Sequence, residues 1–200
     1  MQRAVQTGDF SVIVIGASAG GVPALKQLFA GLPHDLQAAI FVVLHFPSSR
    51  TSYLPEILSK VGPLKAHHVI ATEEIRAGEV YIACPNRHLV IEEGLVLATT
   101  APKENRHRPA INPLFRSAAW AFGSRVIGVV LSGILDDGTA GLWEIKRHGG
   151  KAVVQSPTDA DHPQMPQNAI ANVDVDYVVP IGKMADVLAS LCKCETAHEY

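Results

Sequence analysis

The sequence is poor in cysteine, in excess charge of either sign and in long apolar runs. Its three cysteines cannot all pair, and neither a disulfide framework nor a zinc site is indicated. The 17 Lys and Arg residues against 19 Asp and Glu residues give a formal net charge of -2, which provides no long-range attraction for a nucleic acid. No run reaches the roughly 18 apolar residues that a membrane-spanning helix requires. We therefore expect a cytoplasmic protein with no nucleic-acid partner and no direct membrane insertion.

The composition is that of a globular chain. Of the 200 residues, 48% are hydrophobic and 18% are charged, which is enough apolar material for one well-buried core. Two domains of about 100 residues each would need a linker between them, and the sequence shows none. We expect one domain over residues 10–191, with tails at residues 1–9 and 192–200.

Strand and helix patterns alternate along most of the chain. Apolar runs rich in β-branched residues predict strands, and helical periodicity predicts helices between them. The predicted strands are residues 10–15, 38–44, 126–131, 151–155 and 175–179, and the predicted helices are residues 22–31, 51–60, 112–122, 139–148 and 183–191. Residues 64–100 hold shorter β-rich pieces separated by turn residues, which predict hairpins. The sequence therefore predicts an α/β fold: a three-layer α/β/α arrangement with a mostly parallel, doubly wound sheet and a β-hairpin insertion.

A G-x-S-x-G pattern at residues 16–20 follows the first predicted strand. In a strand-to-helix turn this pattern exposes the serine hydroxyl, here that of Ser18, and directs main-chain N–H groups toward a developing negative charge. The pattern also occurs by chance, so a simple turn or helix-cap role for Ser18 stays open at this point. A dinucleotide-binding loop is a weaker alternative, because the G-x-G-x-x-G pattern has glycine where Ser18 stands.

Two further chemical groups are predicted at the same edge of the sheet. His45 directly follows the second predicted strand, and the strand at residues 126–131 runs toward Asp136 and Asp137. The carboxyl ends of parallel strands meet at one edge, where ligands gather. An imidazole there can act as the base for Ser18, and a carboxylate can orient the imidazole. Taken singly, a hydrogen-bonded structural histidine and an N-cap aspartate are the alternatives.

Longer motifs resemble those of one known family, the CheB methylesterase domain of chemotaxis enzymes. They occur in the family's order over about residues 10–190. The motifs are GASAGG at 16–21, LHFP at 44–47, CPNRH at 84–88, RP at 108–109, LFRSAA at 114–119, LSGILDDG at 131–138, and MP at 165–166 with Ala169. Together they are far more specific than G-x-S-x-G alone.

The resemblance implies a serine hydrolase that cleaves glutamate γ-methyl esters on methylated chemoreceptor cytoplasmic domains and, in some members, deamidates receptor glutamines. Matched by position, Ser18 is the nucleophile, His45 the general base and Asp137 the group that orients the base. Main-chain groups near Ala19 and Ile134 are expected to support the oxyanion. No cofactor and no metal are expected. A separate response-regulator or kinase partner is also compatible with the resemblance.

The sequence departs from the family pattern near these residues. Ala19 stands where threonine is frequent, and Asn112 stands where aspartate is frequent. Ile134 and Leu135 replace a Met-Gly pair. Because glycine allows a close backbone approach, we expect the side chain of Leu135 to narrow the pocket or to alter substrate choice.

Regulation and docking are less determined than the chemistry. Full-length chemotaxis enzymes carry an N-terminal receiver domain and linker, whereas nine residues precede the first predicted strand here, so we expect no phosphorylation control in cis. An excised catalytic domain and a natural single-domain homologue both fit. The basic segment with Lys103, Arg106, His107 and Arg108 reads as a solvated loop or as a docking charge for acidic receptor helices. Two functional alternatives stay open: a catalytically inactive receptor-binding domain, and a hydrolase of another protein ester.

Overall fold

The computed structural model describes residues 10–45, 51–92 and 94–194. Its main sheet has seven strands in the order β10-β9-β8-β1-β2-β5-β3, and every neighbouring pair is parallel. These strands are β1 (Ser11–Ala17), β2 (Ala38–Leu44), β3 (Lys65–Val69), β5 (Glu79–Ala83), β8 (Val126–Val130), β9 (Lys151–Gln155) and β10 (Tyr177–Val179). A small antiparallel sheet has the order β4-β7-β6, with β4 (Glu73–Glu74), β7 (Leu95–Thr99) and β6 (His88–Glu92).

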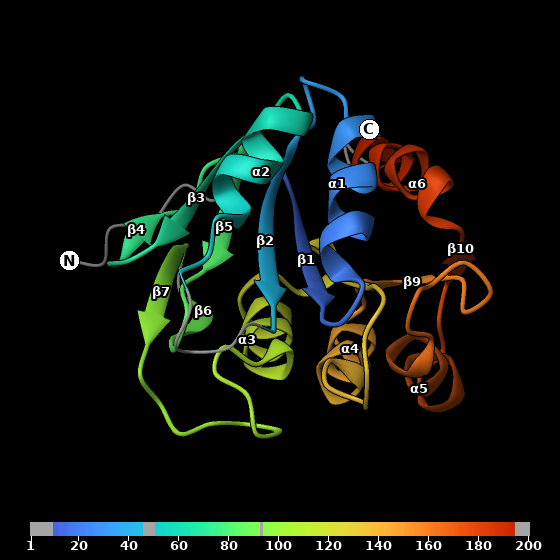
Figure 1. Cartoon of the computed structure of the whole chain (residues 1–200). Coiled ribbons are helices and arrows are strands. Elements are labelled where there is room, and N and C mark those ends of the chain that lie inside the picture. Colours follow the sequence, from blue (N-terminus) through green and yellow to red (C-terminus); the bar gives the residue numbers. More distant parts are fainter. Residues whose placement is uncertain (1–9, 46–50, 93, 195–200) are drawn as a thin grey trace.

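Helices cover both faces of the main sheet, as Figure 1 shows. On one face lie α1 (Gly21–Gly31), α2 (Leu54–Val61) and α6 (Ile181–Cys194). On the other face lie α3 (Ile111–Phe122), followed by the short 3₁₀ helix η1 (Gly123–Arg125), α4 (Thr139–Arg147) and α5 (Gln164–Asn172). None of the helices in the described ranges is long and apolar enough to cross a bilayer.

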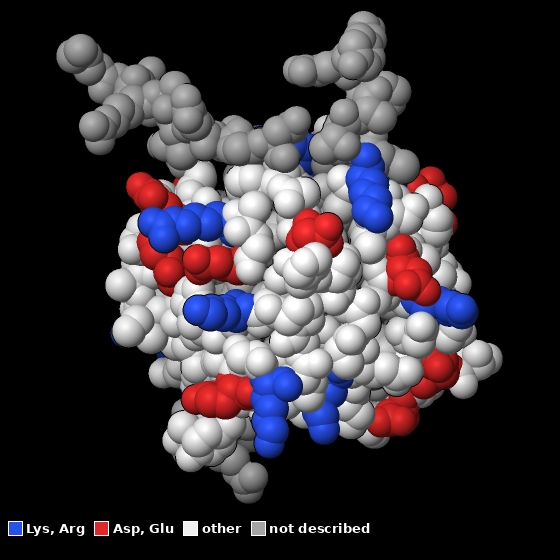
Figure 2. All heavy atoms as spheres, turned by 90° about the horizontal axis from the view of Figure 1, so that it is seen from above, with Lys and Arg blue, Asp and Glu red and all other residues white. Residues whose placement is uncertain are grey.

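The main sheet is buried on both faces, which explains the unbroken apolar runs in the sequence. In β1, Ile13 and Ile15 pack toward α1, α2 and α6, whereas Val12 and Val14 pack toward α3, α4 and α5. On the surface formed by α1, α2 and α6, basic and acidic side chains are scattered among uncharged ones (Figure 2). No patch of a single sign is visible on that surface.

The predicted three-layer α/β/α architecture is confirmed, and one part of the prediction is wrong. Residues 64–100 do not consist of hairpins alone, because β3 and β5 are parallel members of the main sheet. A short β-rich piece has the same local pattern whether its partner is adjacent in sequence or distant, so the pattern could not separate the two cases. The β6-β7 pair is the expected hairpin, with His88 opposite Thr99.

The ends of the chain differ slightly from the predicted boundaries. Helix α6 continues to Cys194, and Cys192 is buried in the core that α1 and α6 share, so residues 192–194 continue the helix instead of opening a tail. The predicted N-terminal tail at residues 1–9 and residues 195–200 lie outside the described residues. Phe46 and Pro47 of the LHFP motif also lie outside them.

The topology places the carboxyl ends of β1, β2 and β8 side by side at one edge of the sheet. Strand β1 lies between β2 and β8, and the chain leaves β1 for α1 on one face but leaves β8 for α4 on the opposite face. The two loops therefore diverge at the carboxyl ends of the strands, which is the edge at which α/β proteins bind ligands. Hydrogen bonds tie the strand ends together: His45 N–H donates to Ala17 O at 3.1 Å, and Ser18 N–H donates to Ser132 O at 3.0 Å.

Candidate active site

Ser18 occupies the turn between β1 and α1. Gly20, the residue before α1, has a φ of 72°, a left-handed conformation that glycine adopts without strain. A Cβ at Gly20 would lie 2.6 Å from Ser132 Oγ, so the turn also needs the space that glycine leaves. The Gly21 N–H donates to Ser18 O at 2.9 Å and closes the turn. The local sequence therefore holds Ser18 at the end of β1.

A chain of hydrogen bonds joins the three residues that the sequence singled out. Ser18 Oγ lies 3.2 Å from His45 Nδ1, and His45 Nε2 lies 2.7 Å from Asp137 Oδ2. The side chains of His45 and Asp137 are only 5% and 2% exposed. The adjacent Asp136 is exposed to solvent, so Asp137 is the carboxylate at the site.

Helix α3 directs its first amides at the Asp137 carboxylate. Ile111 N–H donates to Oδ2 at 2.7 Å and Asn112 N–H to Oδ1 at 3.3 Å, and the Asn105 side-chain amide donates to Oδ1 at 2.9 Å. Burial by itself raises the pKa of Asp137, but the hydrogen bonds from His45, Ile111 and Asn105 outweigh it and lower the pKa below its ordinary value. Asp137 is therefore ionised at neutral pH.

An ionised Asp137 determines the tautomer of His45. A carboxylate can only accept hydrogen bonds, so His45 Nε2 must carry the proton and donate it to Asp137. His45 Nδ1 then has a free lone pair that faces the Ser18 hydroxyl. The two nitrogens are used in the opposite sense from serine proteases, where Nε2 faces the serine and Nδ1 faces the aspartate.

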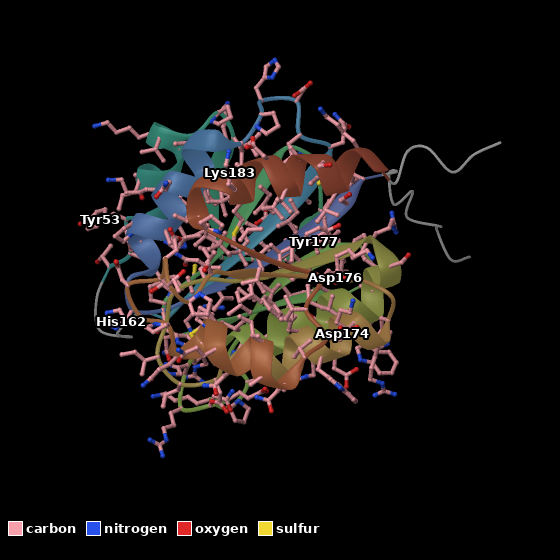
Figure 3. The ribbon with its side chains drawn as sticks, turned by 90° about the vertical axis from the view of Figure 1, so that its right-hand side faces the viewer. Tyr53, His162, Asp174, Asp176, Tyr177 and Lys183 are labelled. Carbon is pink, nitrogen blue, oxygen red and sulfur yellow. The ribbon has the colours of Figure 1, made fainter. Side chains whose placement is uncertain are left out.

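The loop after β8 is anchored against the Ser18 turn. Ser132 Oγ donates to Ala19 O at 2.8 Å and accepts the His162 N–H at 2.9 Å. The Gly133 N–H donates to His162 O at 2.9 Å, and a Cβ at Gly133 would lie 2.9 Å from Ser18 Cβ. Figure 3 shows His162 at the edge of the molecule where the parallel strands end.

Ala19 follows Ser18 in the loop after β1, and Ile134 lies in the loop after β8. Within the described residues, neither the Ala19 nor the Ile134 N–H donates to a protein acceptor. These are the two positions at which oxyanion support was expected. The same ranges contain no group of three or more His, Cys, Asp and Glu residues able to hold a metal ion. The chemistry at this edge is thus that of a hydroxyl, an imidazole, a carboxylate and main-chain amides.

Comparison with known proteins identifies the family. The sequence model described as CheB methylesterase matches residues 13–188. The chain belongs to the CheB methylesterase family. The resemblance predicted from the motifs is therefore confirmed.

Relatives in this family match the sequence along nearly the whole chain. A Leptospira interrogans protein provisionally named protein-glutamate methylesterase/protein-glutamine glutaminase is 38% identical over 92% of this chain and 95% of its own length. A Methanosarcina acetivorans protein-glutamate methylesterase/protein-glutamine glutaminase is 36% identical over 88% of this chain, which spans only 52% of that relative. The crystal structure of the Thermotoga maritima CheB methylesterase catalytic domain superposes with a TM-score of 0.86 and 32% identity, covering 91% of this chain and 98% of that domain.

The segment before α3 contributes two site residues that sequence reasoning missed in this CheB family member. Asn105 binds Asp137, and the His107 ring stacks on the His45 ring, with centroids 3.7 Å apart and planes 5° apart. His107 is therefore not part of a solvated loop. The adjacent RP motif was the signal in the sequence, because Arg108 binds Asn86 Oδ1 and two main-chain carbonyls and so holds the segment.

The departures from the CheB family pattern have local explanations. Leu135 has a φ of 69° and is 52% exposed, and its backbone is held by the side chains of Gln164 and Asn168. Asn112 Oδ1 accepts the N–H groups of Gly138 at 3.1 Å and Gly141 at 2.8 Å, so an amide caps α4 without adding a second charge beside Asp137.

Proposed function

We propose that this chain is a serine hydrolase that cleaves glutamate γ-methyl esters on methylated chemoreceptors, with Ser18 as nucleophile, His45 as base and Asp137 as the group that orients the base. The observation that carries the proposal is the partly buried, hydrogen-bonded chain from Ser18 Oγ through His45 to Asp137. Nucleophile, base and orienting group within hydrogen-bond reach are the signature of an activated serine. The family and the names of its relatives support a protein glutamate ester as the substrate.

The proposed reaction uses His45 Nδ1 first as a base and then as an acid, while Nε2 keeps its hydrogen bond to Asp137. As Ser18 Oγ bonds to the ester carbonyl carbon, His45 Nδ1 takes the hydroxyl proton, and Asp137 stabilises the resulting imidazolium. The proton then passes from His45 to the departing methoxide, so methanol leaves and a glutamyl ester of Ser18 remains. Water attacks this ester by the same route, which releases glutamate and restores Ser18.

Backbone amides support the negative charge in this scheme. The Ala19 and Ile134 N–H groups are the proposed donors to the oxyanion, and each donor of this type is worth about 3 kcal/mol. Because these donors are main-chain groups, the change from the family's threonine to Ala19 leaves the donor in place. A glutamine side chain would react through the same acyl-enzyme with ammonia as the leaving group, which fits the double name of the relatives.

The decisive experiment measures methanol release from a methylated chemoreceptor cytoplasmic fragment. We expect turnover by the wild type and loss of turnover in Ser18→Ala, His45→Ala and Asp137→Ala at equal folded concentration. Ser124→Ala is the matched control, because Ser124 is an exposed serine at the far end of α3. Its activity should equal that of the wild type.

Each negative result has a distinct meaning. A folded wild type that binds the receptor fragment without releasing methanol would replace the hydrolase with an inactive receptor-binding domain. Turnover that survives Ser18→Ala would require another nucleophile. Labelling of Ser18 by a small serine-directed probe without methanol release would keep the hydrolase but point to another protein ester.

A further inference from the structure

The His107 side chain lies on the proposed base. Its imidazole is parallel to that of His45 within 5°, at a centroid separation of 3.7 Å. At this distance the two rings overlap in van der Waals contact over much of their faces. His107 is half-buried and His45 is nearly buried, so the stack covers one face of the proposed base and shields it from water.

The backbone that carries His107 is a tight turn held in place. Glu104 and His107 exchange two main-chain hydrogen bonds, at 3.1 and 2.8 Å, around Asn105 and Arg106. Both central residues have positive φ, 48° and 67°, as a type I′ turn requires. Arg106 pays a steric cost in this conformation, and strain of this kind gathers at functional sites.

Three anchors fix this turn against the rest of the site. Arg116 on α3 forms two hydrogen bonds with the Glu104 carboxylate, at 2.6 and 2.8 Å. Asn105 binds Asp137. Buried His88 accepts the Ala110 N–H and donates to Pro102 O, which holds the segment on both sides of the turn. Contacts with α3, Asp137 and His88 therefore fix the position of the turn that carries His107.

We propose that His107 is a positioning residue that sets the plane of the His45 imidazole by ring stacking. Hydrogen bonds tolerate a range of angles, so those to Ser18 and Asp137 alone define the plane of the His45 ring only loosely. A flat ring in parallel contact removes that freedom and keeps the Nδ1 lone pair directed at Ser18 Oγ. The inference rests on the proposed role of His45 and identifies a further residue on which that role depends.

The charge state of His107 agrees with this role. Burial lowers its pKa, the nearby His45 lowers it further, Asp137 acts in the opposite direction, and Lys103 again lowers it. The carboxylate of Glu104, on the same turn, is engaged by Arg116. A neutral ring can stack on the imidazolium that His45 becomes, whereas a protonated ring would repel it.

The test measures the rate at which a rhodamine-tagged fluorophosphonate labels Ser18, a reaction that needs the activated serine but no receptor contacts. His107→Ala should lower this rate by about 10- to 100-fold, because small misplacements of reacting groups have effects of that size. His107→Phe, which keeps a flat ring, should stay within about fivefold of the wild type. His107→Leu fills similar volume without a ring face and should behave like His107→Ala.

Controls separate stacking from general damage. His34→Ala removes an exposed histidine outside the site and should label at the wild-type rate. Melting temperatures report whether each variant is folded, and the proton NMR signal of His45 Nε2–H reports the His45–Asp137 hydrogen bond without any reaction. We expect this signal to be retained in His107→Phe and broadened in His107→Leu.

The outcomes distinguish this inference from the proposed function. Labelling of the wild type that is absent in Ser18→Ala, but equal in His107→Ala and the wild type, would overturn the positioning role and leave the hydrolase intact. Equal labelling rates in His107→Leu and His107→Phe, both close to the wild type, would mean that His107 only fills space. A wild type that is not labelled at all would count against the hydrolase itself.

Discussion

Asp137 carries a negative charge that several groups of the site stabilise by hydrogen bonds. It accepts hydrogen bonds from His45, Asn105 and three main-chain amides, those of Ile111, Asn112 and Gly138. The N-terminus of α3 adds the positive end of its helix dipole. Because the pKa of Asp137 is lowered on folding, its ionised form stabilises the fold above the unfolded pKa of about 4, and this contribution is lost as the pH falls further.

Replacing Asp137 with asparagine should remove catalysis while keeping the shape of the site. An amide can donate as well as accept, so it no longer forces the proton onto His45 Nε2 and no longer stabilises the imidazolium. We expect kcat for methanol release to fall by about 10⁴-fold, the size of the loss in a serine protease with the same change. Asp136→Asn is the matched control, since Asp136 is adjacent but exposed, and its kcat should match the wild type.

His107 should make the protein less stable in mild acid. Its pKa is lowered in the folded state, so below an unfolded pKa of about 6.5 the unfolded chain binds a proton that the folded chain resists. Protonation therefore favours unfolding, and stability falls as the pH drops through this range. We expect the melting temperature of His107→Phe to fall less than that of the wild type between pH 7 and pH 5. A parallel fall in both proteins would show that other groups cause the acid sensitivity.

At the scale of elements, helix α3 links the parts of the site. Its N-terminus holds Asp137, and its Asn112 side chain caps α4. Its Arg116 also anchors the turn that carries His107. A shift of α3 would thus move the carboxylate, the loop after β8 and the stacked histidine together.

The loop after β8 offers a test of backbone strain. Leu135 has a φ of 69°, which costs a non-glycine residue about 1 kcal/mol or more, and half of its side chain is exposed. Leu135→Gly should therefore raise the free energy of unfolding by up to about 1 kcal/mol in urea denaturation. Ile134→Gly is the control, because Ile134 is similarly exposed at 44% without a positive φ, and it should lower stability by about 1 kcal/mol.

The opposite result would be informative for specificity. A loss of stability in Leu135→Gly as large as in Ile134→Gly would mean that contacts of the Leu135 side chain offset its strain. In that case the Leu135 side chain would make stabilising contacts at the edge of the site. Methanol release by Leu135→Gly, measured at equal folded concentration against the wild type, would then separate a role in substrate choice from one in stability.

Across the whole molecule, the sequence predicted the position of site residues that follow strands, but not of those that lie in the turn before α3. Ser18, His45 and Asp137 each come after an apolar run that is unambiguous as a buried strand, and parallel strands end at one edge. Their meeting in space could therefore be expected before the structure. Their proposed chemical roles rest on the family resemblance and on the geometry together.

Other features could not be read in the same way. The parallel pairing of β3 with β5 depends on partners that the local pattern does not identify. Asn105 and His107 reach the site through a turn with two positive φ values, and nothing in an Asn-Arg pair signals that conformation, since glycine is the usual second residue. Arg108 looked like a docking charge but is held by Asn86 and main-chain carbonyls.

Lys103 and Arg106 are then the charges of this segment that remain exposed for docking, and Arg106 is the one in the turn that carries His107. It stands between Asn105 and His107, beside the proposed base, and we expect it to attract acidic side chains that flank the methyl ester of a receptor helix. Arg106→Glu should lower kcat/KM for the receptor fragment by about tenfold at low salt, and the difference should shrink as salt screens the charges. Arg106→Lys should stay close to the wild type. All three side chains lack β-branching, so each bears the same backbone cost at this positive φ.

The small fluorophosphonate separates docking from chemistry in this last comparison. It carries no receptor sequence, so Arg106→Glu should label Ser18 at the wild-type rate even where receptor turnover has fallen. A loss of labelling would place the effect in the turn and in the His107 stack. Receptor turnover unchanged by charge reversal at low salt would remove Arg106 from docking, and the groove that borders the site between α3, α4 and α5, lined by Asn105, Arg116 and Trp143 among others, would be the next surface to test.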